Sequence, residues 1–215
     1  MEATVEALLT GRAVRFTERG ERSAIAKAPV EGPRRVGWLG VEGDEQADLT
    51  VHGGRDKAIH HYPRDHYPGW QASIGPHPKF DAPGAFGENI STTGWTETEV
   101  CIGDRLRLGS ALVEVSEGRQ PCWKQAHHLG RPGIVAAMVK SGRSGWYYRV
   151  IEEGAVAAGD NIALVERVHS EWPVARVFGL IIGGKHKGQA AALRDLARVE
   201  QLAEGWRARA AKLAR

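Results

Sequence analysis

One of the two cysteines of this 215-residue chain lies between two basic side chains. Arg119 and Lys124 flank Cys122, and Pro121 precedes it, shortly after a run of alternating apolar residues typical of a strand. Nearby cations stabilise a thiolate over the thiol, and the thiolate is the form that attacks sulfur or carbon and binds soft metals. The alternative is that Cys122 is a small buried hydrophobic residue, as many cysteines outside disulfides are. The segment alone does not decide between the two.

Residues 40–58 form a polar, glycine-rich stretch that offers groups for proton transfer. Glu42 and Asp44 supply carboxylates and His52 supplies an imidazole, and both groups suit proton exchange or hydrogen bonding. Gly53 and Gly54 allow tight turns and a close approach of the backbone to a ligand. Taken alone, however, the stretch is more typical of a long solvated connection with turn glycines.

Further histidines lie before and after Cys122 in the chain. The pair His60-His61 falls in an expected strand, where neighbouring side chains point to opposite faces, so only one of the two can share a site with another residue. His66 follows in a helix-like segment and is another candidate for proton transfer. A zinc site formed by Cys122 with His127-His128 lacks the paired spacing of zinc ligands. A lone histidine is more often a surface or core residue than a ligand.

Asn89, Ser23 and Lys27 are weaker candidates for ligand contacts. The amide of Asn89 can donate and accept hydrogen bonds across a cleft, although Gly87-Glu88-Asn89 is equally typical of a turn. Ser23 and Lys27 are four residues apart and would point to the same side of a strand. Each of these signals is weak alone.

The composition is that of a globular protein without membrane spans. Hydrophobic residues make up 42% and charged residues 26% of the chain, and no apolar run approaches the roughly 18 residues of a membrane span. The N-terminus has no basic start followed by an apolar stretch, so a secretory signal is not expected. Two cysteines without framework spacing fit a reducing compartment. We therefore expect a cytoplasmic protein without a disulfide between Cys101 and Cys122, and with Cys101 packed in a strand.

Basic residues are concentrated in the C-terminal tail. From Arg167 onward there are ten Lys or Arg residues against four Asp or Glu, whereas the whole chain carries a net charge of +3. A basic helical tail can bind nucleic acid or an acidic protein, but a solvated helix face is the commoner cause. The tail also lacks the alternation of basic and aromatic residues typical of single-strand binders. A nucleic-acid partner is therefore not expected.

The pattern of apolar residues predicts a strand-rich part followed by a helical tail. Strands are predicted at residues 12–16, 24–27, 59–62, 100–102, 105–108, 111–116 and 161–168, and helices at 64–74 and 133–141. The two strands around Gly109-Ser110 should form a hairpin that leads directly to Cys122. In the tail, Pro173 is placed to open a helix over 174–182. Apolar spacing predicts further helix over 190–213, where Gly205 leaves one helix or two open.

Taken together and in this order, several segments resemble the MOSC family, named for the C-terminal domain of molybdenum-cofactor sulfurases, and in particular its YiiM-like bacterial branch. The resemblance rests on residues 23–27, 40–48, 51–54, 61–64, 86–91 and 102–104 and on Pro121-Cys122, and the tail over 172–177 resembles the start of a small three-helix domain. It implies a mainly β (α+β) fold. A MOSC-type β-barrel with peripheral helices would occupy residues 1–168, and a small, shortened C-terminal helical domain would occupy residues 169–215.

The resemblance also implies a cofactor. In molybdenum enzymes of this family the thiolate of the family cysteine binds molybdenum held by a pterin dithiolene, and this role falls on Cys122. Arg119 and Lys124 are then available for the pterin phosphate. The other expected contacts of the molybdenum cofactor are Asn89, Ser23, Lys27 and Asp44, and the candidate catalytic proton donors, which the sequence does not rank, are Glu42, His52 and His66. Pterin cofactors are often lost from open clefts, so purified protein need not retain the group.

The expected activity follows from the same resemblance. The YiiM-like branch is associated with detoxifying N-hydroxylated bases such as 6-hydroxylaminopurine, which implies two-electron reduction of N–OH to N–H by an oxidoreductase. The chain has no flavin or nicotinamide fingerprint and no cysteine cluster, so a separate flavin or iron–sulfur reductase is expected to supply the electrons. Two alternatives remain open: a sulfur carrier with a persulfide on Cys122, or a non-catalytic protein that binds the molybdenum cofactor.

Overall fold

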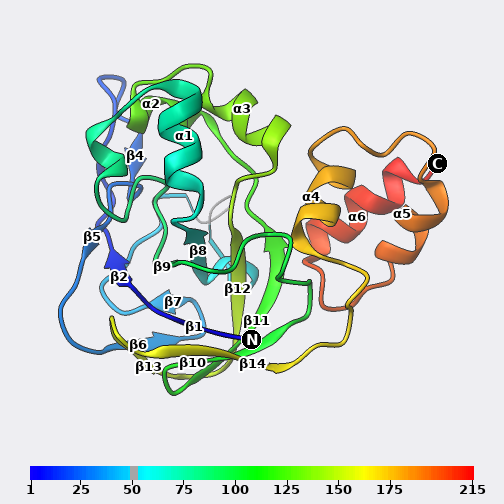
Figure 1. The fold of residues 1–215 in the computed structure, drawn as a ribbon, viewed down its shortest axis with the longest axis horizontal. Coiled ribbons are helices and arrows are strands. Elements are labelled where there is room, and N and C mark those ends of the chain that lie inside the picture. The colour runs from blue at the N-terminus through cyan, green and yellow to red at the C-terminus, as the bar shows by residue number, and fades with distance from the viewer. Residues whose placement is uncertain (49–52) are drawn as a thin grey trace.

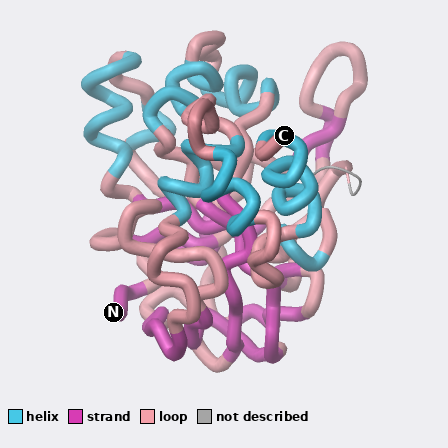
Figure 2. Tube along the Cα trace, turned by 90° about the vertical axis from the view of Figure 1, so that its right-hand side faces the viewer, coloured by secondary structure: helices cyan, strands magenta, loops and turns pink. Residues whose placement is uncertain are grey.

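A computed structural model describes residues 1–48 and 53–215 of the chain. Its main feature is a nine-stranded sheet with helices along one side and a second group of helices at one end (Figure 1). Helices and strands segregate in the view turned by 90°, with most helices in the upper half and strands in the lower half (Figure 2). The fold is mixed α and β, with six α-helices among the described residues.

The strands alternate with short turns. They are β1 (Glu2–Thr4), β2 (Ala7–Thr10), β3 (Val14–Arg15), β4 (Arg22–Ser23), β5 (Ala28–Pro29), β6 (Arg34–Gly37), β7 (Gly40–Val41), β8 (Ile59–Pro63), β9 (Ile90–Thr92), β10 (Arg105–Leu108), β11 (Ala111–Gly118), β12 (Trp146–Glu152), β13 (Gly154–Val156) and β14 (Asn161–Glu166). The helices are α1 (His66–Ile74), α2 (Trp123–Leu129), α3 (Ile134–Ser141), α4 (Val174–Ile181), α5 (Ala190–Leu196) and α6 (Glu204–Leu213), with 3₁₀ turns η1 (Arg55–Lys57) and η2 (Pro78–Phe80).

The main sheet is open at both ends. Its strands lie in the order β1-β14-β10-β11-β12-β8-β9-β2-β5, and all neighbours are antiparallel except β8 and β9. The expected closed barrel is therefore not supported, because within residues 1–48 and 53–215 the outer strands β1 and β5 do not pair. One reason is visible in β5, which has two residues, one of them Pro29. Proline has no backbone N–H to donate, so it is found at sheet edges.

Two predicted strands are replaced by turns that short-range hydrogen bonds hold. Over residues 24–27, the hydroxyl of Ser23 accepts from the N–H of Ile25 at 3.2 Å, and the N–H of Lys27 bonds the carbonyl of Ile25 at 2.9 Å. Near residue 101, the carboxylate of Asp104 accepts from the N–H of Cys101 at 2.8 Å. Such local hydrogen bonds compete with the backbone pairing of neighbouring strands. Cys101 accordingly forms an isolated β-bridge to Pro173 and is not part of a strand. The prediction that Cys101 is packed holds, since it is 2% exposed.

The C-terminal tail folds into three helices. The predicted helix over 174–182 is α4, and the long predicted segment is two helices, α5 and α6, separated at residues 197–203. The chain turns there because the N–H of Ala203 bonds the carbonyl of Ser116 on β11 at 2.9 Å. One hydrophobic cluster includes Val115 and Trp146 of the sheet as well as Phe178 and Leu193 of the tail. The division into two domains at residue 168 therefore stays a prediction.

A second hydrophobic cluster fixes the helices beside β8. It contains Trp70 of α1, Leu129 of α2 and Met138 of α3. At its centre the rings of Tyr62 and Phe86 stack with centroids 4.0 Å apart, an arrangement that adds to the burial of their apolar surface. This cluster sets the position of α2, whose first turn follows the cysteine.

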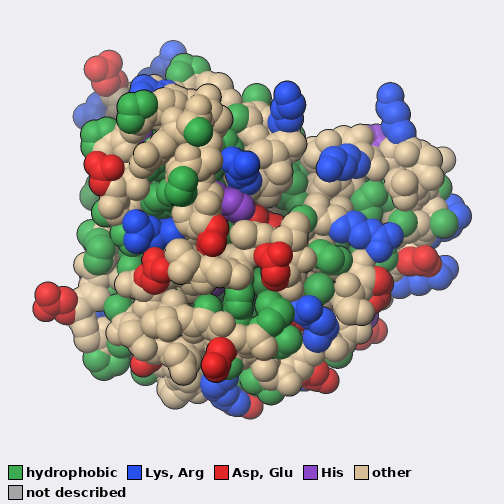
Figure 3. Space-filling model, viewed as in Figure 1, with side chains coloured by type: hydrophobic (Ala, Val, Ile, Leu, Met, Phe, Trp, Pro, Cys, Tyr) green, Lys and Arg blue, Asp and Glu red, His purple; other side chains and the backbone are tan. Residues whose placement is uncertain are grey.

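The surface of the molecule is mixed in charge. On the face shown in Figure 3, basic and acidic side chains are interspersed, and several Lys and Arg side chains lie over the α4–α6 group. Among the described residues, none of the helices has the length and apolar character needed to span a lipid bilayer.

Candidate active site

A cleft brings together the residue types expected to contact a ligand. Its walls come from residues 23–27, the loop at 44–47, β8, the loop at 86–89 and the start of α2. Seven of the side chains selected from the sequence line it: Cys122, Arg119, Lys124, Asn89, Ser23, Lys27 and Asp44. These residues come from segments far apart in the chain, so only the fold makes them neighbours.

Cys122 is placed by the end of β11 and the beginning of α2. The strand ends at Gly118, and the N–H of Arg119 then bonds the carbonyl of Gly145 at 2.9 Å. Cys122 has an extended backbone and is the residue directly before α2, whose first turn closes with a 3.0 Å bond from the N–H of Gln125 to the carbonyl of Cys122. The thiol is partly exposed in the cleft, and Cys122 and Cys101 form no disulfide.

Arg119 presents a buried cation to the same cleft. The residue is 6% exposed, and its Nη2 donates to Oε1 of Gln125 at 3.0 Å. The amide of Gln125 is in turn held by the carbonyl of Ala85 at 2.8 Å. Nη1 of Arg119 has no hydrogen-bond partner in the part of the chain that the structure describes. Buried polar groups nearly always have partners, so this nitrogen is suited to bind an anionic oxygen.

A network of hydrogen bonds and an ion pair connects further polar side chains of the cleft. Lys27 pairs with Asp44, whose carboxylate also accepts from the N–H of Gly11 at 2.8 Å and from Nδ2 of Asn89 at 2.9 Å. Oδ1 of Asn89 accepts from the N–H of His60 at 3.0 Å. Burial lowers the pKa of Lys27, although the charge of Asp44 opposes that shift. These side chains line the cleft as expected, and their mutual bonds hold its shape.

His60 and Tyr147 also line the cleft, although they were not selected from the sequence. Their rings lie 5.1 Å apart between centroids. Burial, reinforced by the charge of Arg119, lowers the pKa of His60 well below 6.5, so its imidazole is neutral at pH 7. Burial raises the pKa of Tyr147 to about 12. The rule that strand neighbours face opposite sides could have suggested His60, because His61 points away and bonds Thr92 at 2.8 Å.

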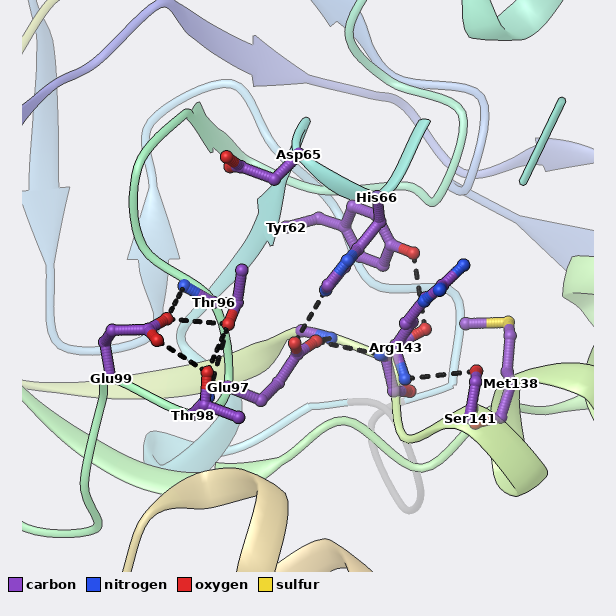
Figure 4. Close-up of polar contacts among 12 residues, drawn as sticks. Tyr62, Asp65, His66, Thr96, Glu97, Thr98, Glu99, Met138, Ser141 and Arg143 are labelled. Carbon is purple, nitrogen blue, oxygen red and sulfur yellow. Dashed lines mark hydrogen bonds and ion pairs between the residues drawn. The ribbon is translucent and has the colours of Figure 1, made fainter. Parts of the chain in front are cut away.

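Of the three expected proton donors, Glu42 and His66 do not line the cleft that contains the cysteine. Glu42 is exposed and lines a separate surface hollow beside Trp38. His52 lies outside the described residues. His66 begins α1, and its Nε2 lies 2.6 Å from Oε2 of Glu97 (Figure 4). Neither of these two residues lines the cleft. Their catalytic roles stay predictions.

Another ionisable pair connects the cleft to a second hollow. Lys57 lines the cleft, and its Nζ lies 3.6 Å from Oε1 of Glu117. The side chain of Glu117 is 5% exposed, and this burial raises its pKa to about 7 against the attraction of Lys57. Lys57 and Glu117 also line a second hollow that opens beside α6. No sequence pattern identified this pair, because the shift arises from burial.

Within residues 1–48 and 53–215, Cys122 belongs to no cluster of metal-binding side chains. Among the described residues no group of three or more His, Cys, Asp or Glu side chains could hold a metal ion. The zinc site considered for Cys122 with His127 and His128 is thus not formed, and Nε2 of His127 instead lies 3.1 Å from the carbonyl of Phe16.

Comparison with known proteins places these features in a family context. Residues 48–163 match the MOSC domain. The chain is 45% identical over 159 residues to Protein YiiM of Escherichia coli strain K12, a match that covers 74% of this chain and 70% of that protein. It is 42% identical over 160 residues to a protein of Gibberella moniliformis named Reductase, covering 74% of this chain and 28% of that protein. The crystal structure of YiiM from Geobacillus stearothermophilus is similar, with a TM-score of 0.83 at 32% identity over 99% of this chain and 100% of that one.

Proposed function

The chain belongs to the MOSC domain family, and from that premise we propose that it is a molybdenum-cofactor-dependent reductase of N-hydroxylated bases such as 6-hydroxylaminopurine. The observation that carries the proposal is the cleft lined by both Cys122 and Arg119, a buried cation with one N–H group that has no partner in the described chain. A soft thiolate and an anion-binding group in one cleft fit a metal carried by a phosphorylated organic cofactor. The relative named Reductase supports an oxidoreductase class.

The residues present fit such a cofactor. Nη1 of Arg119 and Nε2 of His60 are buried polar atoms on the cleft wall without hydrogen-bond partners in the described chain. Cys122 would hold the metal, Arg119 and Lys124 would hold the pterin phosphate, and His60 and Tyr147 would contact the pterin or the substrate. When bound, the molybdenum cofactor would supply two-electron transfer at this cleft.

The reduction also consumes protons, which the protein must provide. An N-hydroxylamine takes up two electrons and two protons to give an amine and water, so a proton must reach the departing oxygen. His60 is neutral and buried, which makes it a poor first donor. We propose that the Lys57 ammonium donates to that oxygen and regains its proton from Glu117, which lies 3.6 Å away and faces a second hollow of the surface.

The electrons must come from elsewhere. The chain has two cysteines, whereas iron–sulfur centres are commonly held by four. We therefore propose a separate reductase with a flavin or an iron–sulfur centre as the partner.

The first test is the molybdenum and pterin content of the full chain after expression in cells that make the cofactor. Wild type and Cys101→Ser, the matched control at the other cysteine, should contain molybdenum in near-stoichiometric amounts, and Cys122→Ser should contain almost none. The loaded protein should then reduce 6-hydroxylaminopurine when a chemical donor supplies electrons. Retained metal or activity in Cys122→Ser would refute the proposal. A persulfide on Cys122 in protein that never takes up metal would favour the sulfur carrier instead.

A further inference from the structure

The carboxylate of Glu97 is buried where three segments of the chain meet (Figure 4). Its Oε2 lies 2.6 Å from Nε2 of His66 at the start of α1. Its Oε1 accepts the backbone N–H groups of Ser144 at 2.9 Å and Gly145 at 2.6 Å. Glu97 is 4% exposed, so both oxygens are used inside the protein. The carbonyl of the same residue accepts from the N–H of Ala175 in α4 at 2.8 Å.

The turn held by Glu97 in turn holds the backbone of Arg119. The hydroxyl of Ser144 donates to the carbonyl of Arg119, and the N–H of Arg119 donates to the carbonyl of Gly145 at 2.9 Å. Both backbone polar groups of Arg119 therefore bond this one turn. Gly145 has a φ of +72°, and an added Cβ would lie 2.2 Å from the carbonyl oxygen of His61, so the turn has little room to adopt another shape.

The position of the Arg119 guanidinium depends on this backbone anchor. Nη2 of the side chain donates to Gln125, and Nη1 has no hydrogen-bond partner among the described residues. A guanidinium with a nitrogen that no group of the described protein holds takes its direction largely from its main chain and its packing. Movement of the turn at residues 144–145 would therefore move the guanidinium of Arg119, a residue that lines the cleft.

We propose that Glu97, supported by His66, is a positioning residue for anion binding: it fixes the turn at Ser144 and Gly145 and thereby aims Nη1 of Arg119 into the cleft. This gives His66 a role through Glu97 rather than as a proton donor to substrate. Hydrogen bonds to a buried carboxylate are among the stronger ones in proteins, and deleting the carboxylate leaves three donors unsatisfied. The inference rests on the proposed function only in taking the anion to be the phosphate of a cofactor.

The test measures inorganic phosphate binding by calorimetry to the full chain, purified from cells unable to make the molybdenum cofactor. Glu97→Ala should weaken phosphate binding by about tenfold, the equivalent of about 1.4 kcal/mol. Glu97→Gln keeps an acceptor oxygen for both N–H groups and should stay within about twofold of wild type. Asp104→Ala is the matched control, since Asp104 is 0% exposed and accepts from the N–H of Cys101 and from Arg167, away from the cleft.

A double-mutant cycle shows whether Glu97 acts through Arg119. In an Arg119→Ala background, Glu97→Ala should cause no further loss of phosphate affinity. Additive losses, an equal loss in Asp104→Ala, or phosphate affinity in Glu97→Ala equal to that of wild type would overturn the inference, as would a wild-type chain that does not bind phosphate. A chain that binds phosphate in this Glu97-dependent way but never takes up molybdenum would refute the proposed function and leave the positioning role intact.

Discussion

Ionisation of Glu117 should work against folding at neutral pH. Burial raises its pKa from the ordinary value of 4.5 to about 7, with Asp56 adding to the shift and Lys57 and Arg149 opposing it. The folded chain therefore holds this proton more tightly than the unfolded chain does. Between about pH 4.5 and about pH 7 the folded state binds more protons, so the free energy of unfolding falls as the pH rises through that window.

The size of the effect follows from the two pKa values. Each pH unit between them corresponds to about 1.4 kcal/mol, so the charged form costs the folded state about 3 kcal/mol above pH 7. Glu117→Gln keeps the shape of the protonated side chain and removes its ionisation. The stability of this variant relative to wild type should therefore increase by about 3 kcal/mol between pH 4.5 and pH 8.

Urea unfolding of both proteins at the two pH values, followed by tryptophan fluorescence, measures this difference. The comparison at pH 4.5 is the internal control, since any change in packing caused by the substitution is present there as well. Carboxyl NMR of Glu117 gives the pKa directly, and Lys57→Gln should move it upward by removing an attractive charge. A stability difference that is the same at both pH values would refute the reasoning, and with it the role of Glu117 as a proton reserve near neutral pH.

Two further substitutions test the walls of the cleft. Lys27→Met should lower the free energy of unfolding by about 3–5 kcal/mol, because it leaves the carboxylate of Asp44 without its cation. The side chain of Asp44 is 4% exposed, so water cannot replace that cation well. A loss below about 1 kcal/mol, measured by urea unfolding, would contradict this prediction. Gly145→Ala should cost about 3 kcal/mol or more and weaken phosphate binding, since it combines a positive φ with a Cβ 2.2 Å from the carbonyl oxygen of His61. Its control is Gly159→Ala, where φ is +93° but no atom lies within 4 Å of the new Cβ, and thermal unfolding should show only about 1 kcal/mol of loss there.

Local patterns predicted the elements that depend on near neighbours in the chain. The strand over 105–108 was predicted with its observed bounds, and the next strand with its correct start, because apolar alternation and the turn at Gly109 define the hairpin locally. Helices α3 and α4 agree within one residue of their predicted bounds. The strand predicted at 24–27 was wrong because a serine hydroxyl bonds the backbone two residues ahead, a contact that apolar patterns do not register.

For the candidate site, the sequence provided the chemistry and part of the lining. It identified Cys122 between two cations, and the tertiary structure places Arg119 and Lys124 in the same cleft. It did not single out Lys57 within the stretch over 40–58, and it could not identify Tyr147, since both reach the cleft only through the fold of distant segments. It also could not predict the turn held by Glu97. That turn depends on hydrogen bonds from Ser144 and Gly145, which lie 47 and 48 positions after Glu97 in the chain.

By itself the sequence determined which reactive groups the chain carries and which short segments form strands or helices, because both depend on residue type and near neighbours. Only the tertiary structure decided that the sheet stays open, that His60 rather than His61 faces the cysteine's cleft, and that Glu117 keeps a proton near neutral pH. The physical reason is that pairing of sheet edges, the direction of a side chain and the desolvation of a carboxyl are all set by atoms from distant parts of the chain.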